Sequence, residues 1–297
     1  MLDCLVIGGG PGGMVAATYL KRFHRDVVIV DDGCSRAELI AKSHNIPGFP
    51  RGISGARMLR RLQDHARKMR VITHKDRVVS LHRSGDVFHA YGREGVWHAR
   101  TVVLATGVVD RMPPLLDIRR ALRRGIVRLC PVCDAYEATG RRIAIYGGNY
   151  EDLKTHARFL RTFSPHAITV VATEEDAAMH PRRTVSQGLD IMRAPDKVLF
   201  GPRSCRIADR HRTVEVDVVY VALGADVQSS LAEILGADTD ENGALVVDAH
   251  MQTCVDGLYA VGDVVSGLNQ ISAATGQAAI AATAIHNRLP LNALGGV

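Results

Sequence analysis

The first 31 residues contain a strand, a glycine-rich turn, a helix and a second strand, and this order constrains the fold more than any other feature. The apolar run LDCLVI leads into GGGPGG, which is followed by MVAATYLKRF, with helical periodicity, and by the strand-like DVVIVDD. Within the turn, Gly8, Gly10 and Gly13 fill a GxGxxG frame. Such glycines let the backbone approach a pyrophosphate at a helix N-terminus. The chain is therefore predicted to open with a dinucleotide-binding unit.

Asp31 ends the second strand of this unit. An acid at that position typically hydrogen-bonds the ribose of an adenosine. A GxGxxG frame alone is weak evidence, but here the flanking strand, the helix and the terminal acid are all present. The context therefore favours a dinucleotide site over the alternative, a glycine-rich turn that binds nothing.

Composition indicates a globular protein of about two domains, because the 297 residues are 46% hydrophobic and 23% charged. The N-terminus runs directly into a strand without the pattern of an export signal, and no apolar run is long enough to span a bilayer. A cytoplasmic protein without a membrane partner is expected. The net charge of +6 is not accompanied by a nucleic-acid-binding motif, so nucleic acid is not an expected partner either.

Cys130 and Cys133 form a CxxC motif in RLCPVCDAY. A zinc site would need a second pair of ligands, and the other cysteines are isolated in the sequence, so no metal is predicted. A redox pair is favoured, because two sulfurs at this spacing can close a small ring and nearby cations lower a thiol pKa. Asp134 is a candidate proton donor and acceptor for the leaving or attacking thiolate. The alternative interpretation is that Asp134 is an ordinary acidic residue near a helix N-terminus.

An arginine cluster lies immediately before the CxxC motif. It is either a solvated helix face or a docking surface for an acidic protein or ligand, and the sequence leaves both open. The cluster consists of Arg119, Arg120, Arg123, Arg124 and Arg128.

Further along the chain, residues 71–107 show the alternation of short strands and end in VVLATG, whereas GLYAVGDVV predicts another strand before a long Ala-rich helix. Together with GGGPGG, NIPGFPRGISG, CPVCD and NQI, these motifs resemble the low-molecular-weight thioredoxin reductase family over essentially the whole chain. The resemblance implies an α/β fold with two Rossmann-like three-layer domains and, usually, a homodimer. A discontinuous FAD-binding domain would comprise residues 1–113 and 224–297, and an inserted NAD(P)-binding-like domain, residues 114–223, would carry the CxxC pair.

The resemblance also assigns site residues. The adenosine and pyrophosphate of FAD would be held by Gly8, Gly10, Pro11, Gly12, Gly13 and Asp31. Asn45 would lie near the isoalloxazine, and the remaining cofactor contacts would be Ala105, Thr106, Gly107, Gly262, Asp263, Gln270 and Ile271. Cys133 would be the sulfur nearest the flavin, Cys130 the one exchanged with the partner, and Asp134 the acid/base. The expected partner is a thioredoxin-like protein or a small dithiol or disulfide.

The second glycine-rich turn, in IAIYGGNYED, departs from the family pattern. Asn149 and Asp152 occupy the second and third positions of the glycine frame, where side chains obstruct pyrophosphate binding and close helix packing. Glu151 adds negative charge where a helix N-terminus would have to hold a pyrophosphate. Glu174 and Glu175 stand where the family places cations for the 2′-phosphate. The nucleotide loop is predicted to be degenerate, which disfavours NADPH and makes NADH doubtful.

Two smaller departures agree with this interpretation. After Asp31 the chain continues as CSRAELIAKSHNIPGFP rather than with a Gly-Gly-Gln turn, and so resembles the branch that contains dithiol oxidases. Asn269 stands where reductases commonly have Arg. Three hypotheses remain: a flavin disulfide oxidoreductase that exchanges electrons with a dithiol, a conventional NADPH-dependent thioredoxin reductase, and a non-catalytic FAD-binding redox sensor.

Overall fold

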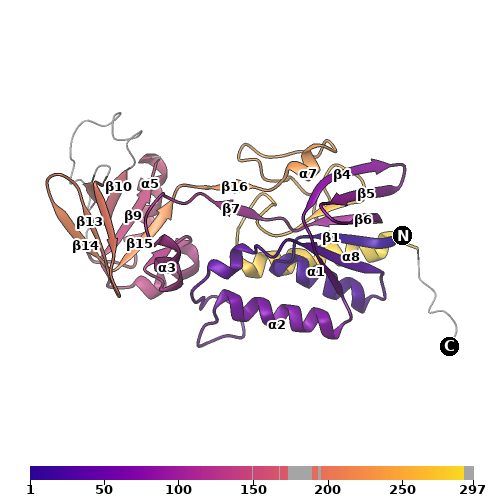
Figure 1. Cartoon of the computed structure of the whole chain (residues 1–297), viewed down its shortest axis with the longest axis horizontal. Coiled ribbons are helices and arrows are strands. Elements are labelled where there is room, and N and C mark those ends of the chain that lie inside the picture. Colours follow the sequence, from indigo (N-terminus) through magenta and orange to yellow (C-terminus); the bar gives the residue numbers. More distant parts are fainter. Residues whose placement is uncertain (149, 167, 173–188, 193–194, 291–297) are drawn as a thin grey trace. The chain divides into compact units, whose positions relative to one another are not determined.

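The structure is a computed structural model that describes residues 1–148, 150–166, 168–172, 189–192 and 195–290. Its internal contacts divide the chain into two compact units (Figure 1). Unit 1 consists of residues 1–38, 55–109 and 226–297, and unit 2 of residues 39–54 and 110–225. The predicted boundaries fall close to two of these borders, but they place residues 39–54 in the first domain. The functions assigned to the two domains remain predictions.

Unit 1 is built on a seven-stranded sheet in the order β3-β2-β1-β6-β5-β4, with β17 also paired to β6. Strand β6 (Val96–Leu104) pairs antiparallel with β5 in its first part and parallel with β1 and β17 in its second. The other strands are β1 (Leu2–Ile7), β2 (Val27–Asp31), β3 (Ile72–Lys75), β4 (Val78–Ser84), β5 (Val87–Gly92) and β17 (Leu258–Ala260).

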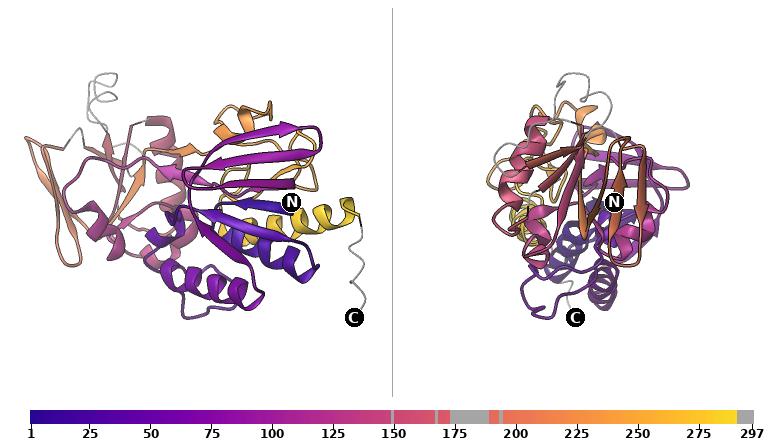
Figure 2. Two further views of the ribbon diagram at one scale, coloured as in Figure 1. Left: turned by 45° about the vertical axis from the view of Figure 1, so that its right-hand side comes forward. Right: turned by 90° about the vertical axis from the view of Figure 1, so that its left-hand side faces the viewer.

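The alternation of apolar residues in β1 and β2 explains why both faces of this sheet are covered. Cys4 and Val6 belong to one core with helices α1 (Pro11–Arg22) and α8 (Ile271–Arg288). Leu5 and Ile7 belong to a second core on the opposite face, with β4, β5 and the short helix α7 (Ser230–Glu233). A strand buried on both faces is expected to be continuously apolar, as CLVI in β1 and VVIV in β2 are. The views in Figure 2 show this layering within the unit.

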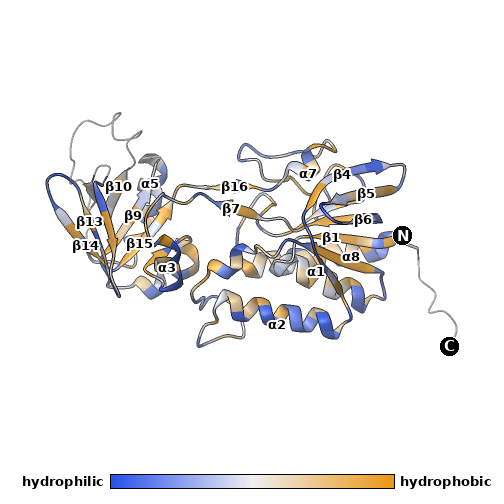
Figure 3. Ribbon diagram, viewed as in Figure 1, coloured by the Kyte–Doolittle hydropathy of each residue, from blue (hydrophilic) through white to orange (hydrophobic). Residues whose placement is uncertain are grey.

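Helix α2 (Gly55–Lys68) is the most amphipathic element of unit 1. It buries Met58, Leu59 and Ala66, while its arginines are exposed. The hydropathy colouring in Figure 3 shows hydrophilic and hydrophobic residues interspersed along this helix. Within the described part of the chain, no helix combines the length and apolar character needed to cross a membrane.

Unit 2 contains a five-stranded parallel sheet in the order β11-β10-β9-β15-β8. Beside it lies an antiparallel three-stranded sheet, β12-β13-β14. The strands are β8 (Val127–Arg128), β9 (Ile143–Gly147), β10 (Ile168–Ala172), β11 (Leu189–Met192), β12 (Lys197–Phe200), β13 (Cys205–Ala208), β14 (Thr213–Val216) and β15 (Val218–Ala222). A separate pair, β7 (Val108–Asp110) and β16 (Ala225–Val227), forms a two-stranded sheet where the chain passes between units.

Alternation also divides the core of unit 2. Ala144 and Val219 pack in a core with helix α3 (Ile118–Arg123) and strands β13 and β14. Ile145 and Tyr220 pack on the other face with helix α5 (Tyr150–Leu160) and with the residues that follow helix α4 (Pro131–Asp134). The CxxC segment therefore lies over the face of the sheet that Tyr220 joins.

Arg25, in the loop between α1 and β2, forms hydrogen bonds with the C-terminal end of α8. Its side chain is buried, with 1% of its surface exposed. The guanidinium donates to the carbonyl oxygens of His286, Leu289 and Pro290 at 2.8, 3.1 and 2.7 Å, and its Nε donates to His286 Nδ1 at 3.1 Å. These carbonyls belong to the last turn of the helix and the residues just beyond it, which lack partners within the helix, so the buried cation satisfies them.

Replacing this cation tests its contribution to stability. Arg25→Met is expected to lower the free energy of unfolding by about 2–4 kcal/mol, because several buried carbonyls lose their donor together. Chemical denaturation measures the loss. The matched control is Arg22→Met on the exposed side of α1, which is expected to change stability by less than about 0.5 kcal/mol; equal losses in both variants would contradict the role assigned to Arg25.

Candidate active site

The first glycine turn of unit 1 is held against a neighbouring strand and against its own helix. Gly8 has a φ of +106°, and a Cβ on it would stand 2.3 Å from the backbone oxygen of Ala105. A Cβ on Gly13 would stand 2.0 Å from the backbone oxygen of Gly8. Gly10 is the N-cap of α1 and provides no side-chain cap, so the N-terminal N–H groups of the helix remain available to a ligand.

Asp31 lies at the end of β2 and is fixed by this turn. The backbone N–H of Gly9 donates to Asp31 Oδ1 at 2.8 Å, and a Cβ on Gly9 would be 2.6 Å from Asp31 Cγ. Burial raises the pKa of the Asp31 carboxyl above its ordinary value, although the Gly9 N–H acts in the opposite direction. Gly9 was missed in the sequence analysis. The signal was present in the run GGG, whose middle glycine falls outside the GxGxxG frame.

The parallel pairing of β2, β1, β6 and β17 brings several predicted residues to one edge of the sheet. Ala105 N donates to the oxygen of Ile7 at 2.8 Å, and Val261 N donates to the oxygen of Leu104 at 2.9 Å. The carboxyl ends of parallel strands form the usual ligand edge of such sheets. The predicted residues that follow these strand ends are Asp31, Ala105, Thr106, Gly107, Gly262 and Asp263. Gln270 and Ile271 are the N-cap and the first residue of α8.

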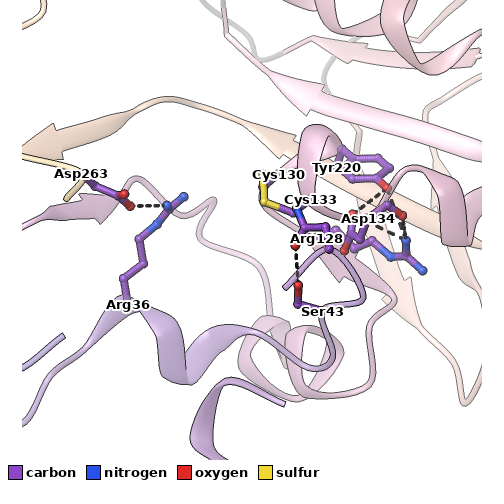
Figure 4. Close-up of a disulfide and its surroundings, with 9 residues drawn as sticks. Arg36, Ser43, Arg128, Cys130, Cys133, Asp134, Tyr220 and Asp263 are labelled. Atoms are coloured by element: carbon purple, nitrogen blue, oxygen red, sulfur yellow. Dashed lines mark hydrogen bonds and ion pairs between the residues drawn. A yellow bond between two sulfur atoms is a disulfide. The ribbon is translucent and has the colours of Figure 1, made fainter. Parts of the chain in front are cut away.

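Arg36 adds a cation to this edge. Its Nη1 lies 2.8 Å from Asp263 Oδ2, and about a quarter of each side chain is exposed (Figure 4). The neighbouring Ser35 approaches the glycine turn, since its Oγ would lie 3.6 Å from a Cβ on Gly10. The short 3-10 helix Arg36–Leu39 therefore begins between the glycine turn and Asp263. No motif in the sequence pointed to Arg36, because its partner is 227 positions away.

Two residues predicted to contact the cofactor form hydrogen bonds with other residues of the protein. The Thr106 hydroxyl donates to the backbone oxygen of Gln228 at 2.6 Å and so ties the end of β6 to the segment after β16. Asn45 belongs to unit 2 by its contacts, and its Oδ1 accepts a hydrogen bond from the Ser43 hydroxyl at 2.6 Å. Contact of Asn45 with the isoalloxazine remains a prediction.

The residues of unit 1 fit the adenosine diphosphate part of FAD. The glycine turn leaves a cradle that side chains would fill, the N-terminus of α1 has no acidic residue in its first turn, and Asp31 presents a fixed carboxylate for a ribose hydroxyl. The donor set is therefore the one that a pyrophosphate and an adenosine require.

Cys130 and Cys133 form a disulfide in unit 2, with an S–S distance of 2.04 Å (Figure 4). Cys130 is the N-cap of α4, and the backbone N–H of Cys133 donates to its carbonyl at 3.1 Å. Both cysteines are partly exposed. Cys4 and Cys205 are buried, and burial raises the pKa of each thiol to about 12, so neither supplies thiolate at neutral pH.

Asp134, the last residue of α4, points toward Tyr220 and Arg128 (Figure 4). The Tyr220 hydroxyl donates to Asp134 Oδ1 at 2.9 Å, and Arg128 Nη1 donates to the backbone oxygen of Asp134 at 2.6 Å. Burial raises the pKa of the Asp134 carboxyl, while Arg128 and Tyr220 act to lower it and Glu137 acts to raise it. The net effect is a carboxyl that retains its proton to higher pH than an ordinary aspartate.

The structure divides the arginine cluster. Arg119, Arg120, Arg123 and Arg124 are exposed on and just after α3. The Arg128 side chain is only 11% exposed and contacts Asp134 and Tyr220 instead of solvent. Treating Arg128 as part of the same exposed group was therefore wrong, because β8 turns its side chain inward. Tyr220 was missed, although a lone hydroxyl in the apolar strand VVYVA needs a buried partner.

The second glycine turn follows β9. A Cβ on Gly147 would stand 2.5 Å from the backbone oxygen of Ala222 and 2.8 Å from Leu153 Cδ2, so packing within unit 2 alone requires glycine there. Asp152 occupies the frame position that corresponds to Gly13 and is exposed. A Cβ at Gly13 would overlap the backbone oxygen of Gly8, whereas the corresponding position of α5 carries an exposed aspartate side chain. Asn149, Glu174 and Glu175 lie outside the described residues, as does the side chain of Glu151.

Comparison with known proteins agrees with this geometry. The family model described as pyridine nucleotide-disulphide oxidoreductase matches residues 2–278. Thioredoxin reductase from Treponema pallidum is 25% identical over 95% of both chains, and that from Borreliella burgdorferi is 23% identical over 88% of this chain and 84% of its own. The crystal structure of thioredoxin reductase from Streptococcus pyogenes superposes with a TM-score of 0.84 at 25% identity, covering 97% of each chain. The predicted α/β fold with Rossmann-like parallel sheets is confirmed.

The glycine turn of unit 1 can be tested by adding a single methyl group. Gly13→Ala is expected to lower the free energy of unfolding by about 1–3 kcal/mol and to release the flavin, because α1 must move away from β1. Denaturation and visible flavin absorbance after gel filtration measure the two effects. Gly276→Ala in α8 is the control: a Cβ there meets nothing within 4 Å, so stability should rise by up to about 1 kcal/mol. Retention of flavin and full stability by Gly13→Ala would contradict the packing described.

Proposed function

The chain belongs to the pyridine nucleotide-disulphide oxidoreductase family, and from this premise we propose that it exchanges electrons between FAD, the Cys130/Cys133 pair and a partner dithiol or disulfide. The observation that carries the proposal is the Cys130–Cys133 disulfide in α4 with the partly buried Asp134 directly after it. Membership of an oxidoreductase family leaves no reason to retain the hypothesis of a non-catalytic sensor.

The exchange begins at the disulfide. A thiolate of the partner attacks Cys130 Sγ, the Cys130–Cys133 bond breaks, and Cys133 leaves as a thiolate. The second thiolate of the partner then attacks the partner sulfur of the mixed disulfide and releases Cys130. The partner loses two electrons and two protons and becomes a disulfide, while the cysteine pair gains the two electrons. The reverse sequence reduces a partner disulfide. Assignment of Cys130 as the attacked sulfur rests on the family resemblance.

Asp134 supplies the proton chemistry of this exchange. Its raised pKa keeps a larger protonated fraction near neutral pH than an ordinary aspartate has. In the protonated form it gives a proton to the thiolate that leaves, and in the ionised form it accepts one from the thiol that attacks. FAD, when bound, supplies a two-electron acceptor and donor for the cysteine pair. The residues that would hold its adenosine diphosphate are those of the glycine turn and Asp31.

We propose further that the electrons enter through the dithiol rather than from a nicotinamide nucleotide. Asp152 puts a side chain and a negative charge in the first turn of α5, where α1 has Gly13 and no acid. Glycine at position 147 is required by the contact with Ala222, so it does not indicate a ligand. Both the side chain and the negative charge of Asp152 oppose the binding of a pyrophosphate. Oxygen would then be the final acceptor, as in a dithiol oxidase.

A conventional NADPH-dependent thioredoxin reductase is the second candidate. It is favoured by the two relatives named thioredoxin reductase, which match over most of their length. The thioredoxin-like partner and the homodimer that the family resemblance implies would fit this candidate. A cytoplasmic location, where Cys34 and Cys254 would stay reduced, fits either candidate.

Anaerobic titration of the purified yellow protein separates the two. Flavin bleaching is followed after addition of NADPH, then NADH, then dithiothreitol. Dithiothreitol is expected to bleach the flavin in the wild type and not in Cys130→Ser or Cys133→Ser, because each serine variant lacks the disulfide that receives the electrons. NADPH and NADH are expected to bleach the flavin at least ~100-fold more slowly than the dithiol does, because the acidic residues Glu151 and Asp152 would repel the pyrophosphate.

The exposed Cys254 provides a control for the serine substitutions. Cys254→Ser should be bleached by dithiothreitol as the wild type is. Rapid bleaching of the wild type by NADPH would instead establish the second candidate.

A further inference from the structure

The two carboxylate oxygens of Asp134 have different surroundings. Oδ1 accepts the hydrogen bond from the Tyr220 hydroxyl at 2.9 Å and lies 3.6 Å from Arg128 Nη1. For Oδ2, the part of the chain that the structure describes provides no hydrogen-bond partner. The Asp134 side chain as a whole is 22% exposed.

The direction of the hydrogen bonds follows from the chemistry of the donors. Arg128 Nη1 lies 3.3 Å from the Tyr220 hydroxyl oxygen. A guanidinium has donors and no acceptor, so the tyrosine oxygen must accept from Arg128. The single proton of the hydroxyl is then directed to Asp134 Oδ1. The hydrogen bonds therefore run from Arg128 to Tyr220 and from Tyr220 to Asp134 Oδ1.

The fold holds this chain of hydrogen bonds in place. Tyr220 is fully buried in β15, on the sheet face that also packs against Ala135 and Ala138. Arg128 is fixed by three acceptors, since its Nε also donates to the oxygen of Gly125 at 3.2 Å and its Nη1 donates to the backbone oxygen of Asp134. The guanidinium carbon lies 6.0 Å from the centre of the Tyr220 ring. Neither side chain can turn away without leaving a buried polar group unpaired.

We propose that Tyr220 is a positioning residue of the redox centre: together with Arg128 it holds Asp134 Oδ1 as an acceptor, so that Oδ2 is the oxygen that takes and gives the proton in thiol-disulfide exchange. The inference rests on the proposed function, because it assigns one atom to the proton step of that reaction. It goes beyond the sequence reading, in which Asp134 was the acid/base without any partner.

The sign of the effect of Tyr220 follows from its role as a donor. A hydrogen bond to a carboxylate stabilises the ionised form. Tyr220→Phe removes that bond while keeping the ring in the core, so the pKa of Asp134 rises further above its ordinary value. Arg128 in β8 still opposes the rise, and Glu137 in the following turn still supports it. The pH above which Asp134 is ionised therefore moves upward.

The experiment compares wild type, Tyr220→Phe, Asp134→Asn and the double variant, all as FAD-loaded protein. Rates of disulfide reduction by dithiothreitol are measured against pH, and the protonated carboxyl band is titrated by infrared difference spectroscopy with Asp134→Asn as the reference. In Tyr220→Phe the carboxyl titration and the corresponding limb of the rate profile are expected to move up by about one pH unit, a tenfold change in proton affinity. In the Asp134→Asn background, Tyr220→Phe should leave the profile unchanged.

Tyr136→Phe is the matched control, because Tyr136 follows the same helix but is 78% exposed. It should behave as wild type in both measurements. A structural role alone would lower the stability of Tyr220→Phe without moving either titration, and that result would overturn the inference while leaving the proposed function intact. An equal shift in the Asp134→Asn background would overturn it as well. Failure of dithiothreitol to reduce the wild-type disulfide would overturn the proposed function and the inference together.

Discussion

The largest sheet of each unit depends on a backbone approach that only glycine permits. At the end of β1 a Cβ on Gly8 would lie 2.3 Å from the oxygen of Ala105, and at the end of β9 a Cβ on Gly147 would lie 2.5 Å from the oxygen of Ala222. In each case the glycine lets the chain pass close to the backbone of the neighbouring strand as it leaves its own strand. The first glycine of the frame is thus a requirement of the fold in both units, whereas the later positions differ between them.

Those later positions separate the two units. Gly13 brings α1 against the end of β1, whereas Asp152 keeps a side chain and a charge at the same position of α5. The loss of a pyrophosphate site in unit 2 remains a proposal, and it rests on this difference between the two helices. This contrast makes the disulfide of unit 2, rather than its glycine turn, the feature on which the proposed chemistry depends. It also places the polar groups around that disulfide at the centre of the mechanism.

Beside the disulfide, burial is the main cause of the shifted pKa of Asp134. Burial raises the pKa of the Asp134 carboxyl above its ordinary value, while Arg128 and Tyr220 limit the rise. The tyrosine belongs to the same apolar strand that builds the sheet, so one residue both fills the core and orients the acid. Unit 1 shows a related arrangement, in which Arg36 at the start of a short 3-10 helix pairs with Asp263 after β17.

The sequence by itself determined the elements whose signal is local. The apolar run LDCLVI, the glycines before α1, Asp31, the long helix α8 and the CxxC pair could all be identified from neighbouring residues, because apolar patterns, turn geometry and ring closure involve short stretches of chain. Only the tertiary structure decided which distant groups meet. Tyr220 reaches Asp134 from 86 positions away and Arg36 reaches Asp263 from 227. In the sequence, Arg128 could not be distinguished from its exposed neighbours, whereas in the structure its side chain is largely buried. The reason is that burial and hydrogen-bond partners are properties of packing and not of local sequence.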